Sequence, residues 1–179
     1  MSDAHDNKTT GYHLFLEPPE PLRGQLQNII LGLGGVYENN IFRPHVTLLG
    51  RITASDEAVL IEHVKRLSAQ TTPFLITLGE IGMEDHYFRA LYLRVERNEV
   101  LESLHDLWTL KIAGATDTRA FVPHLSLFYG DLAQEEKEKM ISSLVLPEVM
   151  TFMVDTVHLY KTEGEVSNWK KIGEFQFSK

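Results

Sequence analysis

The chain has 179 residues, 43% of them hydrophobic and 23% charged, which is typical of one globular domain and unlike collagen, a coiled coil or low-complexity disorder. It contains no cysteine, which excludes disulfides, thiolate nucleophiles and cysteine-based metal sites and makes the cytoplasm the default location. A formal net charge of −8 argues against a basic surface for long nucleic acids but is compatible with small anionic substrates.

The N-terminal segment, residues 1–10, has neither the hydrophobic core of a signal peptide nor an arginine-rich amphipathic pattern. We expect it to be a flexible tail. The longest apolar stretch, Ile29–Val36, is far shorter than the roughly 20 residues that span a bilayer. Residues 11–179 are therefore predicted to form a single two-lobed domain, monomeric and without membrane contact.

The first half of the chain alternates between strand and helix patterns. In chain order it predicts a strand over Tyr12–Leu16, a helix over Leu22–Ile30 that stops at Gly34-Gly35, a strand within Phe42–Gly50, a helix that starts at Ser55–Glu57, and a strand over Phe74–Ile81. Glycine commonly ends a helix, and a side-chain oxygen followed by carboxylates commonly begins one.

The second half repeats this order. It predicts a strand over Leu91–Val95, a helix capped by Asn98 with the apolar stripe Leu101, Leu104, Trp108 and Ile112, a strand within Phe121–Gly130, a helix with the stripe Met140, Ile141 and Leu144, and strands over Phe152–Tyr160 and Trp169–Phe177. Trp108 is expected in the core because it shares a helix face with Leu104.

One motif occurs twice. The pattern Phe-x-Pro-His-aliphatic-hydroxyl-Leu stands at residues 42–48 and again at 121–127, 79 residues later. Leu14 and Leu93, on corresponding predicted strands, each lie 31 residues before the motif histidine. We infer a duplication with repeats over about 11–82 and 88–177, and hence an α+β fold with two lobes around a pseudo-twofold cleft.

The motif can carry acid–base chemistry. Side chains at positions i and i+2 of a strand point to the same face, so His45 emerges with Thr47 and His124 with Ser126. An imidazole can remove or donate a proton near neutral pH, and hydroxyls can donate to phosphate oxygens. The pattern predicts phosphodiester cleavage. A two-histidine metal site is the rival interpretation, but metals usually take three or four protein ligands, and no third ligand recurs beside both motifs.

Paired His-x-[Thr/Ser] motifs in a chain of this size resemble the two-histidine (2H) phosphoesterase superfamily. The resemblance extends from Tyr12 to Phe177, although only the two motif regions are specific. The second motif carries Tyr129 five residues after its histidine, and in this it resembles the cyclic phosphodiesterase branch. Plant-type members of that branch often have cysteines that this chain lacks, so any redox control cannot be carried over.

The resemblance implies a fold of two antiparallel-sheet lobes with helices outside, one lobe holding both chain ends and the other the middle of the chain. It also implies a hydrolase without metal or cofactor that opens a nucleoside 2′,3′-cyclic phosphate or ADP-ribose 1″,2″-cyclic phosphate to a phosphomonoester. On this pattern His124 is expected to act as the base and His45 as the acid, while Thr47 and Ser126 hold the phosphate.

Several other residues are candidates for substrate contact. Tyr129, Phe88 and Trp169 are predicted to stack on the nucleotide, and the Tyr129 hydroxyl to bond the phosphate as well. Arg43 and Arg51 flank the first motif and could attract phosphate, and His13 could face the cleft from the opening strand.

Two further functions remain as alternatives. One is a 2H enzyme that processes short RNA ends, either 2′-5′ RNA-ligase-like or an exonuclease; the negative net charge speaks against the basic groove usual in ligase-like members. The other is a nucleotide-binding module that has lost turnover. Intact histidines and hydroxyls in both halves favour the enzyme.

Overall fold

The computed structural model describes residues 8–37, 41–112 and 120–178. The strands are β1 (Tyr12–Leu16), β2 (Val46–Ile52), β3 (Phe74–Met83), β4 (Leu91–Val95), β5 (His124–Phe128), β6 (Thr151–Val154), β7 (Thr156–Lys161) and β8 (Lys170–Gln176). The helices are α1 (Leu22–Val36), α2 (Glu57–Ser68), α3 (Glu99–Lys111) and α4 (Gln134–Ser143), with 3-10 turns at Tyr87–Arg89 and Val166–Asn168. None of the described helices combines the length and the apolar character needed to cross a bilayer.

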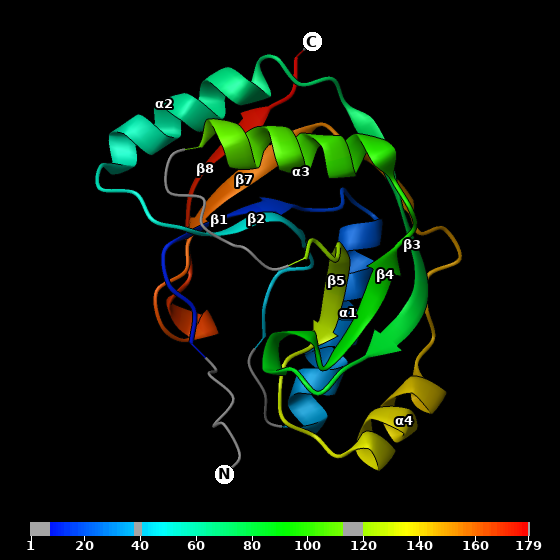
Figure 1. The fold of residues 1–179 in the computed structure, drawn as a ribbon. Helices are drawn as coiled ribbons and strands as arrows, with labels where there is room; N and C mark the ends of the chain where they lie inside the picture. Colours follow the sequence, from blue (N-terminus) through cyan, green and yellow to red (C-terminus); the bar gives the residue numbers. More distant parts are fainter. Residues whose placement is uncertain (1–7, 38–40, 113–119, 179) are drawn as a thin grey trace.

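The strands form one eight-stranded antiparallel sheet in the order β6-β3-β4-β5-β2-β1-β7-β8. The sheet curls, and its two halves meet where β2 pairs with β5 at Val46 and Leu125 (Figure 1). One half contains the first and last strands, and the other contains the strands from the middle of the chain. The predicted α+β fold is confirmed.

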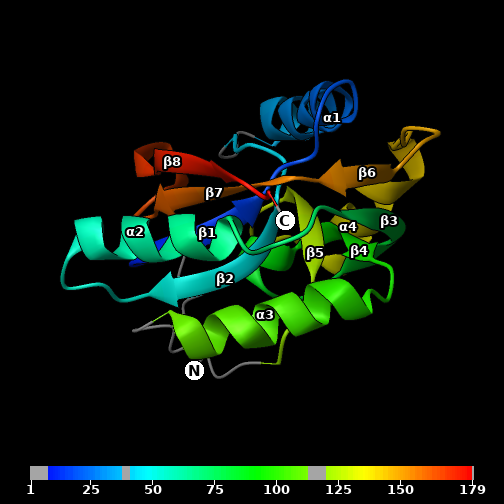
Figure 2. The same ribbon diagram turned by 90° about the horizontal axis from the view of Figure 1, so that it is seen from above.

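The strand order is symmetric about the junction between β2 and β5. Moving outward, β1 corresponds to β4, β7 to β3, and β8 to β6. Each half of the chain thus contributes a strand to the opposite half of the sheet: β3 lies beside β4, and β7 lies beside β1. The helices cross over in the same way, because α1 packs on β5 and α3 on β2, and Figure 2 shows α1 and α3 on opposite sides of the strands. The two motif strands are therefore neighbours at the centre of the fold.

Local sequence signals explain the helix starts. The Asp56 carboxylate accepts the backbone N–H groups of Ala58 and Val59 at 2.9 and 3.3 Å at the start of α2, and Asn98 accepts that of Leu101 at 3.0 Å at the start of α3. Such caps satisfy amides that have no partner within the helix. Trp108 of α3 is fully buried in the core, as expected.

The end of α1 differs from the prediction. The helix continues through Gly34 and Gly35 to Val36, and the N–H of Tyr37 bonds the carbonyl of Leu33 at 3.1 Å. Glycine inside a helix costs only about 1 kcal/mol relative to alanine, which the burial of Leu33 and Gly34 against the core outweighs.

The single strand expected over Phe152–Tyr160 is wrong as well. The structure divides it at Asp155 into β6, which pairs with β3, and β7, which pairs with β1 and β8. At the other end of the chain, residues 1–7 of the expected tail lie outside the described residues. Thr9, however, exchanges backbone hydrogen bonds with Gly164 at 3.0 and 2.9 Å, so the ordered chain begins before Gly11.

Candidate active site

His45 stands immediately before β2, at the entrance of the first motif strand. Its Nδ1–H donates to the carbonyl of Arg43 at 2.7 Å. The Phe15 ring stacks on the imidazole, with 3.7 Å between centroids and 23° between planes, and the residue is only 7% exposed. The histidine is thus fixed both by a backbone carbonyl and by the adjacent strand.

His124 opens β5 in an equivalent way. Its Nδ1–H donates to the carbonyl of Val122 at 2.6 Å, and Tyr92 of β4 meets its ring edge-on at 5.3 Å. Ser126, two residues further along the strand, is buried and donates its hydroxyl to the Phe88 carbonyl at 2.9 Å.

The two backbone hydrogen bonds determine which tautomer each histidine adopts. A carbonyl oxygen can only accept, so Nδ1 carries the hydrogen in both rings. Nε2 is then the acceptor of a neutral ring and the donor of a protonated one. Each half of the site therefore presents an Nε2 atom that is suited to taking up or releasing a proton.

A single cavity of about 480 Å³ collects the predicted site residues. Its lining includes His45, Thr47, His124, Ser126, Phe88, Tyr129 and Trp169. Residues that are far apart in the sequence meet here because β2 and β5 are neighbours in the sheet.

Tyr129 and the two other predicted stacking residues have different environments. The Tyr129 ring is stacked on Phe42 at 3.8 Å and 14° and is only 3% exposed, so one ring face is covered and little of the ring is open to a base in the unliganded protein. Its hydroxyl lies by Ser126, and burial raises its pKa far above the usual value. Phe88 and Trp169 are half-buried, with centroids 6.3 Å apart.

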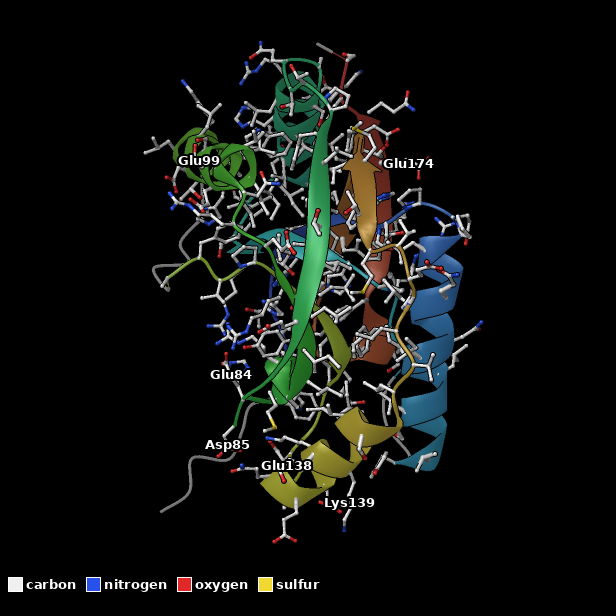
Figure 3. All side chains as sticks on the ribbon, turned by 90° about the vertical axis from the view of Figure 1, so that its right-hand side faces the viewer. Glu84, Asp85, Glu99, Glu138, Lys139 and Glu174 are labelled. Atoms are coloured by element: carbon white, nitrogen blue, oxygen red, sulfur yellow. The ribbon has the colours of Figure 1, made fainter. Side chains whose placement is uncertain are left out.

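The cavity has a basic lining in an acidic protein. Arg51, Arg89 and five histidines contribute to it, and no aspartate or glutamate does among the described residues. The labelled carboxylates Glu99, Glu138 and Glu174 lie instead at the periphery of the molecule (Figure 3). Arg51 and Arg89 supply its positive charge, and because no lining carboxylate opposes them within the described residues, the cavity favours an anion.

Arg43, which the sequence suggested for phosphate attraction, does not line the cavity. Its guanidinium is paired with Glu17 at 2.7 Å. Arg51 does line it, with its backbone in the left-handed region at φ 53° and its N–H donating to His13 Nε2 at 3.3 Å. His13 faces the cavity as suggested.

Burial dominates the ionisation of both motif histidines. It lowers the pKa of His45 to about 4, against smaller opposing effects of the Arg43 carbonyl and Glu17. It also lowers the pKa of His124 to about 4, against the Val122 carbonyl and with the help of the Arg89 charge. Both rings are neutral at pH 7 in the unliganded protein, and an anion placed between them would favour protonation.

Sequence reasoning missed two important lining residues, Phe15 and Arg89. Phe15 follows His13 by two residues on β1, so strand alternation could have identified it. Arg89 lies in a 3-10 turn and pairs with Glu84 at 2.5 Å, an environment without a sequence signature. Within the described ranges, no three histidine, aspartate or glutamate side chains come together as a metal site.

Comparison with known proteins agrees with the motif. A family model described as "Cyclic phosphodiesterase-like protein" matches residues 10–177. A relative from Geobacillus kaustophilus, named "Putative phosphoesterase GK0864", is 30% identical over 125 residues, which cover 68% of this chain and 72% of the relative.

Solved structures share the fold at low sequence identity. The crystal structure of TT0787 from Thermus thermophilus has a TM-score of 0.61 and 16% identity, and covers 93% of this chain and 97% of its own. That of E. coli LigT complexed with 3′-AMP has a TM-score of 0.60 and 15% identity, with 96% and 100% covered. Kluyveromyces marxianus Usb1 is more distant, with a TM-score of 0.52 and 12% identity over 92% and 98%.

Proposed function

This chain belongs to the cyclic phosphodiesterase-like family of 2H phosphoesterases, and from that premise we propose that it hydrolyses a nucleoside 2′,3′-cyclic phosphate or ADP-ribose 1″,2″-cyclic phosphate to a phosphomonoester without a metal. The observation that carries the proposal is that His45 and His124 line one cavity, with each ring fixed through Nδ1 so that Nε2 is left for proton transfer. Acid–base catalysis needs two such groups.

In the proposed reaction His124 is the base and His45 the acid. Nε2 of His124 takes a proton from a water molecule as its oxygen attacks phosphorus, and the bond between phosphorus and one ribose oxygen breaks. Nε2–H of His45 gives its proton to that leaving oxygen, so that one water is consumed for each phosphomonoester formed. Because His45 has a pKa of about 4 in the empty site, it gains its proton when the anionic substrate binds.

Thr47, Ser126 and Tyr129 hold the phosphate oxygens in this proposal. All three are hydroxyl residues that line the cavity together with the two histidines. Ser126 donates to the Phe88 carbonyl in the unliganded protein, so its hydroxyl turns toward the phosphate when substrate binds. Such preorganised donors act most strongly in a water-excluded site.

Phe88 and Trp169 are assigned to the nucleoside. Both are half-buried at the cavity wall, where a base could stack on them. Crystal structures of the structural neighbour E. coli LigT contain 3′-AMP, NADP⁺ or ATP, which supports a small nucleotide as the substrate of this chain.

The proposal is tested by following a panel of substrates with phosphorus NMR in excess chelator. The panel contains nucleoside 2′,3′-cyclic phosphates, ADP-ribose 1″,2″-cyclic phosphate and short RNAs with cyclic phosphate ends. We expect conversion of a small cyclic phosphate to a monoester, and a loss of about 10²- to 10⁴-fold in either His45→Ala or His124→Ala. His63→Ala, in α2 and away from the cavity, is the matched control.

Other outcomes would contradict the proposal. Activity restricted to the RNAs would indicate an RNA-end-processing enzyme, and activity abolished by chelator would indicate a metal site. Nucleotide binding without turnover would indicate a binding module. Full activity in both His45→Ala and His124→Ala would show that these histidines are not the catalytic residues.

A further inference from the structure

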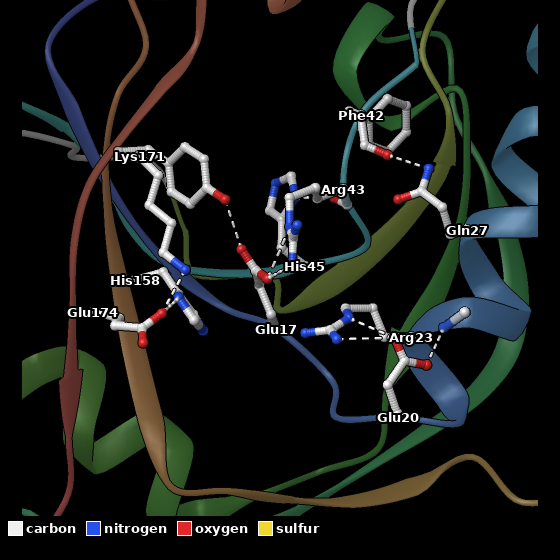
Figure 4. A network of polar contacts seen from close by, with 12 residues as sticks. Glu17, Glu20, Arg23, Gln27, Phe42, Arg43, His45, His158, Lys171 and Glu174 are labelled. Atoms are coloured by element: carbon white, nitrogen blue, oxygen red, sulfur yellow. Dashed lines mark hydrogen bonds and ion pairs between the residues drawn. The ribbon is translucent and has the colours of Figure 1, made fainter.

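A buried carboxylate, that of Glu17, lies beside His45 (Figure 4) and does not line the cavity. Glu17 follows β1 directly, and its side chain is only 2% exposed. It accepts the Tyr160 hydroxyl at 2.7 Å and both Nε and Nη2 of Arg43 at 3.0 and 2.7 Å. Figure 4 shows Glu17 between Arg43 and His158, beside His45.

This carboxylate fixes the backbone that orients the catalytic ring. The residue that Glu17 holds with two hydrogen bonds is Arg43, and the Arg43 carbonyl is the one that accepts Nδ1–H of His45. Both bonds end on Oε2 of Glu17, while its Oε1 accepts from Tyr160, and such charge-assisted hydrogen bonds restrict both partners. In the other half of the site the equivalent carbonyl belongs to Val122, an apolar residue 38% exposed, whose side chain offers no such anchor.

The charges around the two histidines also differ. Glu17 favours the protonated form of His45, against burial and the charge of His124. Around His124 the Arg89 guanidinium opposes protonation more than Glu84 favours it, and the Glu84 side chain is 34% exposed. The pseudo-symmetric site is therefore electrostatically asymmetric, with its buried negative charge on the side of His45.

Glu17 remains ionised in this environment. Burial alone would raise its pKa, but the Tyr160 hydrogen bond and the neighbouring His158 and Arg43 charges outweigh burial and lower it. His158 is buried in β7. On the neighbouring strand β8, Lys171 and Glu174 form an ion pair at 2.6 Å. The Nδ1 of His158 lies 3.8 Å from Glu174.

We propose that Glu17 is a positioning residue for His45: through Arg43 it fixes the carbonyl that orients the ring, and its charge favours the protonated ring that the general acid requires. The inference rests on the proposed function, because only cleavage of a phosphodiester gives His45 that role. It explains why the acid lies in the first motif of a site whose halves are otherwise alike.

The test combines a titration that needs no turnover with a pH–rate profile. The titration follows the His45 imidazole by NMR in saturating sulfate, in wild type, Glu17→Gln and the control Glu57→Gln. Glu57 also accepts a tyrosine hydroxyl, that of Tyr12 at 2.9 Å. Each variant therefore removes one negative charge, while the new glutamine can still accept the hydrogen bond from its tyrosine. We expect Glu17→Gln to lower the pKa of His45 by about one unit, and Glu57→Gln to leave it unchanged.

In the pH–rate profile of kcat, the rate falls on the high-pH limb because the acid loses its proton, and on the low-pH limb because the base gains one. Glu17→Gln should move the high-pH limb to lower pH, for a loss of roughly tenfold in alkaline solution, and leave the low-pH limb in place. Because it also weakens the bonds to Arg43, kcat between the limbs should fall as well, with KM nearly constant. Arg43→Met, altered on a side chain that is 51% exposed, keeps the Glu17 charge but loses the anchor. It should lower kcat at every pH without moving the high-pH limb downward.

Each result distinguishes the inference from the proposed function. An unchanged His45 titration in folded Glu17→Gln overturns the inference even if the wild type is active. A shift of the low-pH limb instead makes His45 the base and also overturns it. Failure of the wild type to open any cyclic phosphate overturns the proposed function, whereas the sulfate titration still decides whether Glu17 controls the charge of His45.

Discussion

Sulfate binding in the cavity should raise the pKa of His45 from about 4 to near neutrality. In the unliganded protein, burial holds the pKa of both motif histidines at about 4, so neither ring is charged at pH 7. A general acid has to carry its proton when substrate is bound. The bound anion must therefore supply the charge interaction that the buried ring lacks.

The size of the effect follows from the burial of the ring. Raising a pKa from about 4 to about 7 requires roughly 4 kcal/mol. Two unit charges ~4 Å apart interact by about 4 kcal/mol at an effective dielectric of ~20, but by only about 1 kcal/mol in bulk water. His45 is 7% exposed, so the larger value applies and a single anion in contact with the ring suffices.

The assay is a pH titration of the imidazole carbon-bound protons by NMR, with and without saturating sulfate. Sulfate is chosen because it does not titrate near neutral pH, and His45→Gln assigns the resonance. We expect a midpoint near pH 4 without sulfate and near pH 7 with it. A midpoint at the ordinary histidine value in the unliganded protein would show that burial does not hold the ring neutral, and one that sulfate does not move would show that a bound anion does not protonate it.

Three further predictions concern binding and stability. Thr47→Val should lower kcat/KM at least tenfold by removing a hydrogen bond to a charged oxygen, worth about 1.5–3 kcal/mol; steady-state rates equal to those of Thr47→Ser would contradict this. Trp169→Leu should raise KM for a cyclic nucleotide about tenfold through lost stacking with little change in kcat, and an unchanged KM would exclude the stacking role. Because the pKa of His45 is about 4 when folded and about 6.5 when unfolded, the unfolded state binds more protons between these values. The free energy of unfolding should therefore decrease by about 3 kcal/mol as the pH falls from 6.5 to 4. Urea unfolding should show a smaller loss in His45→Gln, and equal losses would argue against a buried neutral ring.

The sequence predicted those parts of the fold that depend on local patterns. The period of two in Tyr12–Leu16 and Leu91–Val95 gave strands with the observed bounds, and the cap at Asn98 was placed correctly. The repeated motif predicted that His45 and His124 meet, and both line one cavity. A duplicated pattern carries information about spatial arrangement because equivalent strands take equivalent places about an axis.

Features that depend on which segments pair could not be predicted. Periodicity shows that Phe74–Ile81 is a strand but not that it crosses to the half of the sheet that contains β4. Asp155 gives no clear sign that the chain changes sheet halves there. Likewise, nothing local indicates that Arg43 turns from the cavity to Glu17, a partner 26 residues earlier in the chain. Such choices are made by tertiary packing and by the need to pair a buried charge.

The two-histidine site is tested most directly by a crystal structure with the product, a nucleoside monophosphate, in the cavity. We expect a single phosphate with Nε2 of both His45 and His124 at about 2.6–3.2 Å from its oxygens, and with the Thr47 and Ser126 hydroxyls donating to the remaining oxygens. A phosphate that contacts only one of the two imidazoles, or that binds outside the cavity, would contradict it.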